Sequence, residues 1–255
     1  HYFRHSGRNA LPHSDEYIVV SAIYSYLCQS VQDTTLFNMT IDKNSYGTIA
    51  IAWAVCGLLI FICLHFIPLK ALALSLSIIL ALFAFFVLWF HRVPVRHTPA
   101  GDRIVTSGAD GRVVIIKEVY EKEYLRRQCI QVSVYMDFFN VHANFWPVSG
   151  NVSYYKYHPG KYLLAFLPKA AEENEHSSTA IDTGREEIFF KQIAGTFARR
   201  IVCYSEEGSQ EERGKQCGII KFGSRFDIFL PLDAEVKVKL GEEIKAAETV
   251  IAELR

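Results

Sequence analysis

Three short segments of this chain each place one reactive side chain beside a glycine or a proline. They are SGADGRV at 107–113, NVHANFWPVSG at 140–150 and FGSRFDIFLP at 222–231. Their reactive residues are Asp110, His142 and Ser224. A serine hydroxyl becomes a nucleophile when a base takes its proton, and a carboxylate that orients an imidazole improves that base. These residue types are therefore compatible with an Asp-His-Ser relay acting on a carbonyl group.

Each segment also has a purely structural interpretation. Asp110-Gly111 is a common hairpin-turn dipeptide, and Gly223-Ser224 fits a turn between two strands. His142 fits a hydrogen-bonded histidine of a protein core. The residues taken one by one leave both interpretations open.

Composition excludes some classes of partner and cofactor. Lys plus Arg and Asp plus Glu both number 27, so no overall field attracts nucleic acid. The six cysteines form no CxxC pair and no Cys/His cluster with zinc spacing. We therefore expect reduced thiols, no disulfide framework and no metal site.

Two uncharged segments stand near the amino-terminal end, Thr48 to Ile67 and Ala71 to Phe90. As helices, each would rise about 30 Å, which is roughly the hydrocarbon thickness of a bilayer. The pattern predicts a membrane-associating helical pair within residues 47–96, preceded by an N-terminal extension, 1–46, with no assigned function. A buried hairpin in a soluble core is the alternative, and the pattern does not decide whether the pair spans the bilayer or dips into it.

Charges flanking the helical pair predict its orientation. The short connection carries Lys70, whereas Lys43, Arg92 and Arg96 lie on the other side with the rest of the chain. The positive-inside rule then places residues 91–255 in the cytoplasm. We expect the protein at the cell membrane, with residues 97–255 forming a domain on the cytoplasmic side.

Residues 97–255 read as a mainly β domain, so the predicted fold class is mainly β (α+β) with a helical hairpin in front. Short runs rich in Val, Ile, Phe and Tyr alternate with Gly, Pro, Asn and Asp, as in strands. The predicted strands are Arg112 to Val119, Ile130 to Phe138, Tyr162 to Leu167, Ile188 to Ile193, Ala198 to Tyr204, Gly218 to Phe222, Phe226 to Leu230 and Val236 to Leu240. Lys169 to Glu187 is polar, lacks an apolar period and is predicted to be a long loop, a candidate for substrate contact.

The order of these motifs resembles that of the pyruvoyl-dependent phosphatidylserine decarboxylases, in particular the short bacterial branch with an FGSR-type cleavage motif. Further matching segments are FHRVPVR at 90–96, LPKAAEEN at 167–174 and QIAGTFARRIV at 192–202. The likeness covers roughly residues 47–255. It implies a self-processing enzyme with a β-rich catalytic domain.

The resemblance implies that the chain cuts itself between Gly223 and Ser224. Ser224 would become a covalent pyruvoyl group, with His142 as the base and Asp110 orienting His142. The large chain, 1–223, and the small chain, 224–255, would stay together. Phosphatidylserine would then condense with the pyruvoyl ketone as a Schiff base, lose CO2 and leave as phosphatidylethanolamine.

Two positions depart from the family pattern. Phe139 stands where many members of the longer branch carry a second histidine, which leaves the proton donor for decarboxylation open between His142, a backbone group and water. His176 stands where close relatives more often have arginine, and it is a candidate contact for the lipid phosphate together with Arg199 and Arg200. The implied partners are phosphatidylserine and a bilayer, with a homodimer as a candidate assembly and no nucleic acid.

Two other functions use the same residues differently. A membrane-anchored serine hydrolase would employ Asp110, His142 and Ser224, although the chain lacks a G-x-S-x-G elbow. A non-enzymatic, membrane-tethered β-module would explain the apolar helices but not the FGSR and NVHAN segments.

Overall fold

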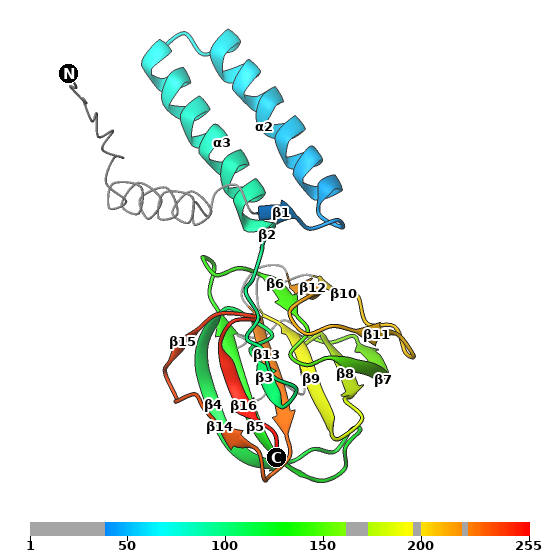
Figure 1. Cartoon of the computed structure of the whole chain (residues 1–255). Coiled ribbons are helices and arrows are strands. Elements are labelled where there is room, and N and C mark those ends of the chain that lie inside the picture. Colours follow the sequence, from blue (N-terminus) through cyan, green and yellow to red (C-terminus); the bar gives the residue numbers. More distant parts are fainter. Residues whose placement is uncertain (1–38, 162–172, 196–199, 221–223) are drawn as a thin grey trace, which may run out of the picture. The chain divides into compact units, whose positions relative to one another are not determined.

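The computed structural model describes residues 39–161, 173–195, 200–220 and 224–255 (Figure 1). The chain divides into two compact units, residues 1–39 and 40–255. The second unit contains both apolar helices and all of the larger sheets. Most of the predicted N-terminal extension lies outside the described residues.

The two apolar segments form an antiparallel helical hairpin, coloured blue and cyan in Figure 1. Its helices are α2 (Tyr46–Phe66) and α3 (Lys70–Phe90). Small buried residues, among them Cys56, Ala73 and Ser77, allow close approach of helices. Trp53 Nε1 donates a hydrogen bond to the Ala84 carbonyl at 3.0 Å. The predicted helical pair is confirmed.

Most of the hairpin surface is apolar and uncovered. Only 11% of the most apolar stretch of α2 and 17% of that of α3 are buried. By length and composition, both helices are able to cross a membrane. A buried hairpin in a soluble core would expose far less apolar surface, so the exposure favours membrane association.

An antiparallel sheet of eight strands has the order β11-β7-β8-β9-β13-β5-β4-β15. Its strands, in chain order, are β4 (Gly111–Tyr120), β5 (Gln128–Met136), β7 (Gly150–His158), β8 (His176–Asp182), β9 (Glu187–Ala194), β11 (Gln210–Glu211), β13 (Ser224–Leu230) and β15 (Glu243–Ile244). Strand β13 lies between β9 and β5, and every one of its residues is buried.

Three smaller sheets complete the part of the fold that the structure describes. The orders are β1-β2, β10-β12-β6 and β14-β16-β3. Their strands are β1 (Met39–Ile41), β2 (Arg92–Pro94), β3 (Ile104–Thr106), β6 (Ala143–Phe145), β10 (Ile201–Cys203), β12 (Gln216–Ile220), β14 (Glu235–Val236) and β16 (Val250–Glu253).

Side chains of β13 alternate between the two faces of the large sheet. Phe226, Ile228 and Leu230 belong to the main hydrophobic core on the inner face. Arg225 and Asp227 point to the opposite, outer face, where they form a buried ion pair at 2.7 Å. Residues that pair directly across neighbouring strands have their side chains on the same face of the sheet. The faces assigned to β13 therefore also assign a face to its partners on β5 and β9.

Most predicted strands match the structure. Four predicted strands correspond to β4, β5, β9 and β13; they are the strands predicted to begin at Arg112, Ile130, Ile188 and Phe226. Those at Ala198 and Gly218 correspond to β10 and β12 in their described parts, whereas Tyr162 to Leu167 lies outside the described residues. Strand β7 was not predicted, because polar residues interrupt its apolar pattern.

Two predictions are wrong. The proposed loop Lys169 to Glu187 contains strand β8, whose polar side chains find partners inside the protein: Ser177 Oγ donates to Gln192 Oε1 at 3.0 Å. The proposed strand Val236 to Leu240 ends after Val236, since β14 has only two residues. In β8 the buried hydrogen bonds take the place of the apolar pattern that the prediction used.

Candidate active site

The end of strand β5 at Met136 lies between two of the candidate residues. Ser224 is the direct partner of Met136 on one side. On the other side Arg112 pairs with Tyr135, which brings Gly111 alongside Met136. Gly111 has a φ of 145°, and a Cβ there would overlap the Tyr135 carbonyl. This close approach requires glycine and holds the neighbouring Asp110 at the end of β5.

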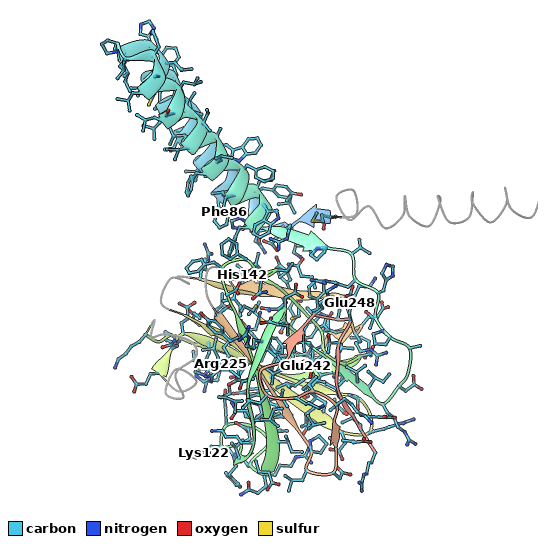
Figure 2. The ribbon with its side chains drawn as sticks, turned by 90° about the vertical axis from the view of Figure 1, so that its left-hand side faces the viewer. Phe86, Lys122, His142, Arg225, Glu242 and Glu248 are labelled. Atoms are coloured by element: carbon cyan, nitrogen blue, oxygen red, sulfur yellow. The ribbon has the colours of Figure 1, made fainter. Side chains whose placement is uncertain are left out.

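His142 reaches the same region through the turn that follows β5. Asp137 and Asn140 hold this turn: Asp137 N–H donates to Asn140 Oδ1 at 2.8 Å, and Asn140 N–H donates to Asp137 Oδ1 at 3.2 Å. The His142 carbonyl then accepts the Ile220 N–H at 3.1 Å. Figure 2 labels His142 at one end of the β domain and Lys122 at the other.

Ser224 and His142 therefore lie at two connections between the same pair of sheets. One connection runs from β5 to β6 and contains His142, and the other runs from β12 to β13 and ends at Ser224. Pairing of β5 with β13 and of β6 with β12 keeps the two connections together. Gly223 lies outside the described residues.

The Ser224 hydroxyl is fully buried. It donates to Met136 Sδ at 3.6 Å. The same sulfur accepts a hydrogen bond from Asn144 Nδ2 at 3.7 Å. A thioether is a weak acceptor, so this contact leaves the lone pairs of the hydroxyl oxygen available.

The His142 imidazole is held in one tautomer. Its Nδ1 lies 3.0 Å from the Asn140 carbonyl, which only accepts, so Nδ1 carries the proton and Nε2 the lone pair. Burial lowers the pKa of His142 to about 4, although the Asn140 hydrogen bond opposes this shift. The histidine is thus neutral at neutral pH, the state that a general base requires.

The Asp110 carboxylate is bound by Arg96 rather than by His142 among the described residues. Arg96 Nη2 contacts both carboxylate oxygens at 2.7 Å, and the Ala246 N–H donates to Oδ1 at 2.8 Å. Arg96 is 8% exposed and Asp110 13% exposed at their side chains. The structure brings Asp110 to the end of β5, and its orientation of His142 stays a prediction.

Two residues of the site were not singled out from the sequence. Arg96 holds Asp110, and the fully buried Phe90 packs its ring on His142 with centroids 4.3 Å apart. Both belong to the FHRVPVR segment at 90–96. The match of this segment to the family pattern indicated that it is important, but it did not indicate which residues Arg96 and Phe90 contact.

The described residues do not bring the three candidate phosphate contacts together at one site. His176 begins β8 on the outer face, where its Nδ1 donates to the Asn174 carbonyl at 2.7 Å. Burial lowers the pKa of His176, which opposes a cationic role at neutral pH. Arg200 is exposed, and Arg199 lies outside the described residues.

The turn before His142 presents apolar side chains to the surface. Phe138 is 40% exposed and Phe139 72% exposed. Arg92 Nη2 donates to the Phe139 carbonyl at 3.1 Å, which ties the turn to the segment that follows α3. Phe139 thus offers an apolar surface, and no titratable group, beside His142.

Comparison with known proteins identifies the family. The sequence pattern of phosphatidylserine decarboxylase matches residues 83–252. The phosphatidylserine decarboxylase proenzyme of Cytophaga hutchinsonii is 44% identical over 217 residues, which cover 84% of this chain and 99% of that protein.

Two further relatives carry the same name. The proenzyme of Porphyromonas gingivalis is 41% identical over 222 residues, covering 85% of this chain and 99% of the relative. That of Amoebophilus asiaticus is 43% identical over 186 residues, covering 72% of this chain and 83% of the relative. With these matches over most of its length, and with the mainly β domain that carries Ser224, the chain belongs to the phosphatidylserine decarboxylase family.

Proposed function

We propose that this chain cuts itself between Gly223 and Ser224, carries a pyruvoyl group at residue 224, and converts phosphatidylserine to phosphatidylethanolamine and CO2. The observation that carries the proposal is the position of Asp110, His142 and Ser224 around the end of β5 in a member of this family.

Self-processing begins at the Ser224 hydroxyl. His142 Nε2 takes the hydroxyl proton, and Oγ attacks the Gly223 carbonyl carbon. The C–N bond of the peptide breaks, the nitrogen of residue 224 receives the proton, and an ester replaces the amide. The buried, neutral imidazole suits this first step, because only its unprotonated form accepts a proton.

Elimination then completes the cut. The α-proton of residue 224 leaves to a base, the electron pair forms the Cα–Cβ double bond, and Gly223 departs as a carboxylate. The dehydroalanine that remains tautomerises to an imine, takes up one water and loses one ammonia. Residue 224 is left as a pyruvoyl group at the start of β13.

The pyruvoyl group supplies a ketone that condenses with the amino group of phosphatidylserine and accepts electrons as CO2 departs. Within this chain, His142 is the residue we assign to proton transfer in that reaction also. Its Nδ1–H stays on the Asn140 carbonyl, so Nε2 is the atom that exchanges protons. Phe139, in the place of a second histidine, supplies no titratable group for this step.

Strand pairing explains why the two products stay associated. The small chain, 224–255, contains β13, which pairs with β5 over seven residues and with β9 over six. The same chain contributes β14 and β16 to a second sheet. A homodimer stays a prediction.

We place the enzyme at the cell membrane, with the catalytic domain, residues 97–255, on the cytoplasmic side. Support comes from the helical pair within residues 47–96 and from the cations Lys43, Arg92 and Arg96 at its catalytic end. The exposed Phe139 adds apolar surface beside His142. Arg199 and Arg200 remain the proposed phosphate contacts, whereas His176 is not retained, because it lies on the face of the large sheet opposite Ser224.

Family membership favours decarboxylation over both other functions. Neither the described residues nor the relatives supply an observation in favour of a serine hydrolase or a non-enzymatic module.

The chemical state of residue 224 tests the proposal. Mass spectrometry of the purified active enzyme should show two chains, 1–223 and 224–255, and the small chain should react with a hydrazine through its ketone. Ser224→Ala should remain one chain of 29.0 kDa and release no CO2 from carboxyl-labelled phosphatidylserine.

The matched control is Ser205→Ala. Ser205 is also buried, but its hydroxyl bonds Thr179 away from the end of β5. This variant should be cut like the wild type. An active, uncut wild-type chain with an unmodified Ser224 would contradict the proposal.

A further inference from the structure

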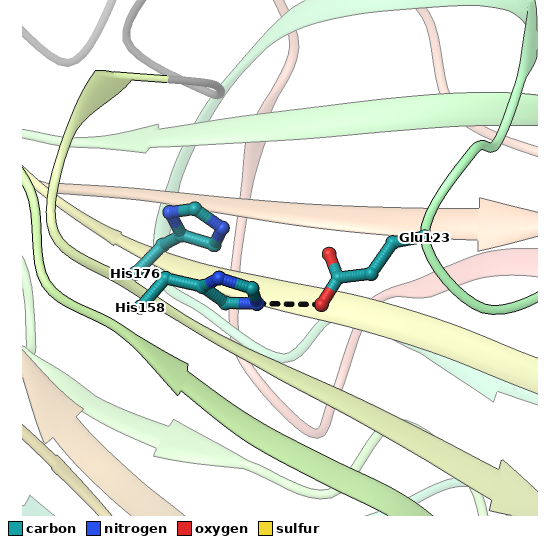
Figure 3. A group of neighbouring side chains, drawn as sticks. All are labelled: Glu123, His158 and His176. Atoms are coloured by element: carbon teal, nitrogen blue, oxygen red, sulfur yellow. Dashed lines mark hydrogen bonds and ion pairs between the residues drawn. The ribbon is translucent and has the colours of Figure 1, made fainter.

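A second cluster of reactive side chains lies on the outer face of the large sheet. It consists of Glu123, His158 and His176, whose ligand atoms all lie within 4.8 Å of one another (Figure 3). His176 shares its face with Arg225, because both pair with Ile193. Ser224 is next to Arg225 in β13, so its side chain points to the inner face. The cluster is therefore separated by the sheet from the proposed reaction at residue 224.

The two histidines are positioned by strand pairing. His158 on β7 is the direct partner of His176 on β8, and their rings are stacked at 4.4 Å with 12° between the planes. His176 Nδ1 donates to the Asn174 carbonyl, so its Nε2 bears the lone pair. A backbone carbonyl that fixes the tautomer in this way is the usual outer partner of a metal-binding histidine.

The carboxylate is positioned by the loop between β4 and β5. Glu121 accepts hydrogen bonds from three consecutive backbone N–H groups, those of Glu123, Tyr124 and Leu125, at 2.8 to 2.9 Å. Tyr124 also stacks on Tyr154 of β7 at 4.7 Å. The loop is thus fixed over the outer face, and Glu123 Oε1 lies 2.6 Å from His158 Nε2.

The second carboxylate oxygen of Glu123 has its own partners. Lys191 Nζ contacts Oε2 at 2.6 Å, and Ser178 Oγ donates to it at 3.0 Å. These contacts orient the carboxylate and leave Oε1 on the side of the histidines. The ammonium group also repels a cation, so it lowers the affinity of the cluster for one.

We propose that Glu123, His158 and His176 form a binding site for one divalent transition-metal ion of the zinc type. Two imidazoles and one carboxylate are a ligand set that zinc accepts, with the fourth position left to water. Imidazole ligands disfavour Mg2+ and Ca2+, which take oxygen ligands. Binding replaces the hydrogen bond between His158 and Glu123 by two bonds to the ion, and the proton on His158 Nε2 moves to Nδ1 of the same ring if the imidazole is neutral, or to solvent if it is charged.

The fourth position has room for a water or a small anion. A cavity of about 600 Å³ is lined by Glu123 and His176 of this cluster, and by Lys117, Lys191 and Arg225. The ion would join β7, β8 and the loop that covers them, and its expected effect is therefore to stabilise the outer face of the sheet.

Direct metal binding tests the proposal without relying on decarboxylation. The full-length chain in detergent, stripped with a chelator, is titrated with ZnCl2 in a calorimeter and with CoCl2 under visible absorption. We expect one saturable site per chain, a rise in the melting temperature, and Co2+ bands of four-coordinate intensity. His158→Gln and His176→Gln should each weaken binding by roughly 10-fold or more, as loss of a metal-site contact does.

Two further variants separate this site from alternatives. His97→Ala removes an exposed imidazole elsewhere and should bind zinc like the wild type. Lys191→Met removes the competing ammonium and should bind zinc several-fold more tightly. The uncut Ser224→Ala chain should also bind zinc, because the cluster does not use residue 224.

Absence of saturable zinc binding in both the wild type and Lys191→Met would overturn the proposal. Equal binding by wild type and both histidine variants would overturn it as well, since the ion would then lie elsewhere. Neither result would bear on the pyruvoyl group, which is detected separately by mass.

Discussion

The imidazole of His142 packs against the ring of Phe90, the last residue of α3, with ring centroids 4.3 Å apart. Both side chains are fully buried. The end of an apolar helix therefore forms one wall around the proposed base, and this wall keeps water from the imidazole. Desolvation of this kind is the main cause of the low pKa of His142, about 4.

Phe90→Ala should change the pH dependence of self-processing. Water admitted beside His142 raises the pKa of the imidazole from about 4 toward its ordinary value of 6.5. The acid limb of the cleavage-rate profile should move to higher pH by the same amount, because only the neutral imidazole accepts the Ser224 proton. Phe83→Ala, which removes an exposed ring of the same helix, should leave the profile in place. An unshifted profile in Phe90→Ala would show that Phe90 does not set the pKa of His142.

The sequence predicted the fold where one physical pattern was strong. Two uninterrupted apolar runs predicted α2 and α3, because an apolar run of about 20 residues with almost no polar residue is typical of a membrane helix. Central strand β13 was predicted for a similar reason, since its apolar residues alternate with buried partners. Strand β8 was missed because its serine and threonine side chains are satisfied inside the protein, which removes the apolar period.

The candidate site could be predicted in its residue types but not in its contacts. Asp110, His142 and Ser224 were found from their segments and from the family pattern. The ion pair of Asp110 with Arg96 depends on how the segment after α3 packs against the domain, and no local pattern encodes it. The cluster of Glu123, His158 and His176 was invisible for the same reason, because strand register brings these distant residues together.

Arg96→Met should slow self-processing through its effect on Asp110. The guanidinium contacts both carboxylate oxygens at 2.7 Å, and its loss frees the carboxylate to rotate. We expect cleavage to slow by roughly 10-fold or more, the scale of a contribution from general acid–base catalysis. The rate is measured as the appearance of the small chain during synthesis of the protein.

The combined variant distinguishes positioning from a general loss of stability. If Arg96 acts through Asp110, then Arg96→Met should add little to Asp110→Asn, because the two residues work as a unit. Arg112→Met is the control, since its ion pair with Glu243 is exposed and should contribute little. Independent, additive losses from Arg96 and Asp110 would contradict the positioning role.

His142 should make the uncut precursor sensitive to acid. Its pKa is about 4 in the folded chain and 6.5 in the unfolded chain, so between these values only the unfolded state binds the proton. The free energy of unfolding should therefore fall as pH drops from 6.5 to 4, by about 3 kcal/mol in total, and should not depend on His142 above that window. Denaturant unfolding of Ser224→Ala at several pH values measures the slope.

The same titration in a second background isolates the histidine. His142→Gln in the Ser224→Ala chain removes the titrating group but retains Arg92, Asp137 and His91, the charged or titratable groups that influence it. The slope between pH 6.5 and pH 4 should become shallower in this variant. Equal slopes in the two chains would assign the acid sensitivity to other groups.

Phe139→Asp should impair the enzyme on bilayers more than on dispersed substrate. Phe139 is 72% exposed in the turn that precedes His142, and a carboxylate there opposes contact with an apolar or anionic lipid surface. We expect a raised KM on phosphatidylserine vesicles and a smaller change on a short-chain, water-soluble analogue. Tyr120→Asp, at a similarly exposed ring on β4, is the control and should behave like the wild type. Equal losses on both substrates would indicate a direct effect on His142 instead.

Asp227→Ala should be among the most destabilising single changes in the catalytic domain. Arg225 donates to both oxygens of Asp227 at 2.7 and 2.8 Å, and Gln131 Nε2 donates to one of them at 3.0 Å. Removal of the carboxylate takes two charge-assisted hydrogen bonds from a buried guanidinium, and breaking a buried ion pair costs about 3–5 kcal/mol. Glu243→Ala, which breaks the exposed pair with Arg112, should cost at most about 1 kcal/mol.

The double variant Arg225→Met, Asp227→Leu tests the reason for that loss. Replacing both ions by apolar side chains removes the buried guanidinium charge together with the carboxylate, so the double variant should be more stable than Asp227→Ala alone. Denaturant unfolding in the Ser224→Ala background gives both free energies without interference from self-processing. A double variant that is less stable than Asp227→Ala would mean that the contacts of the guanidinium, rather than its charge balance, hold β13 between β5 and β9.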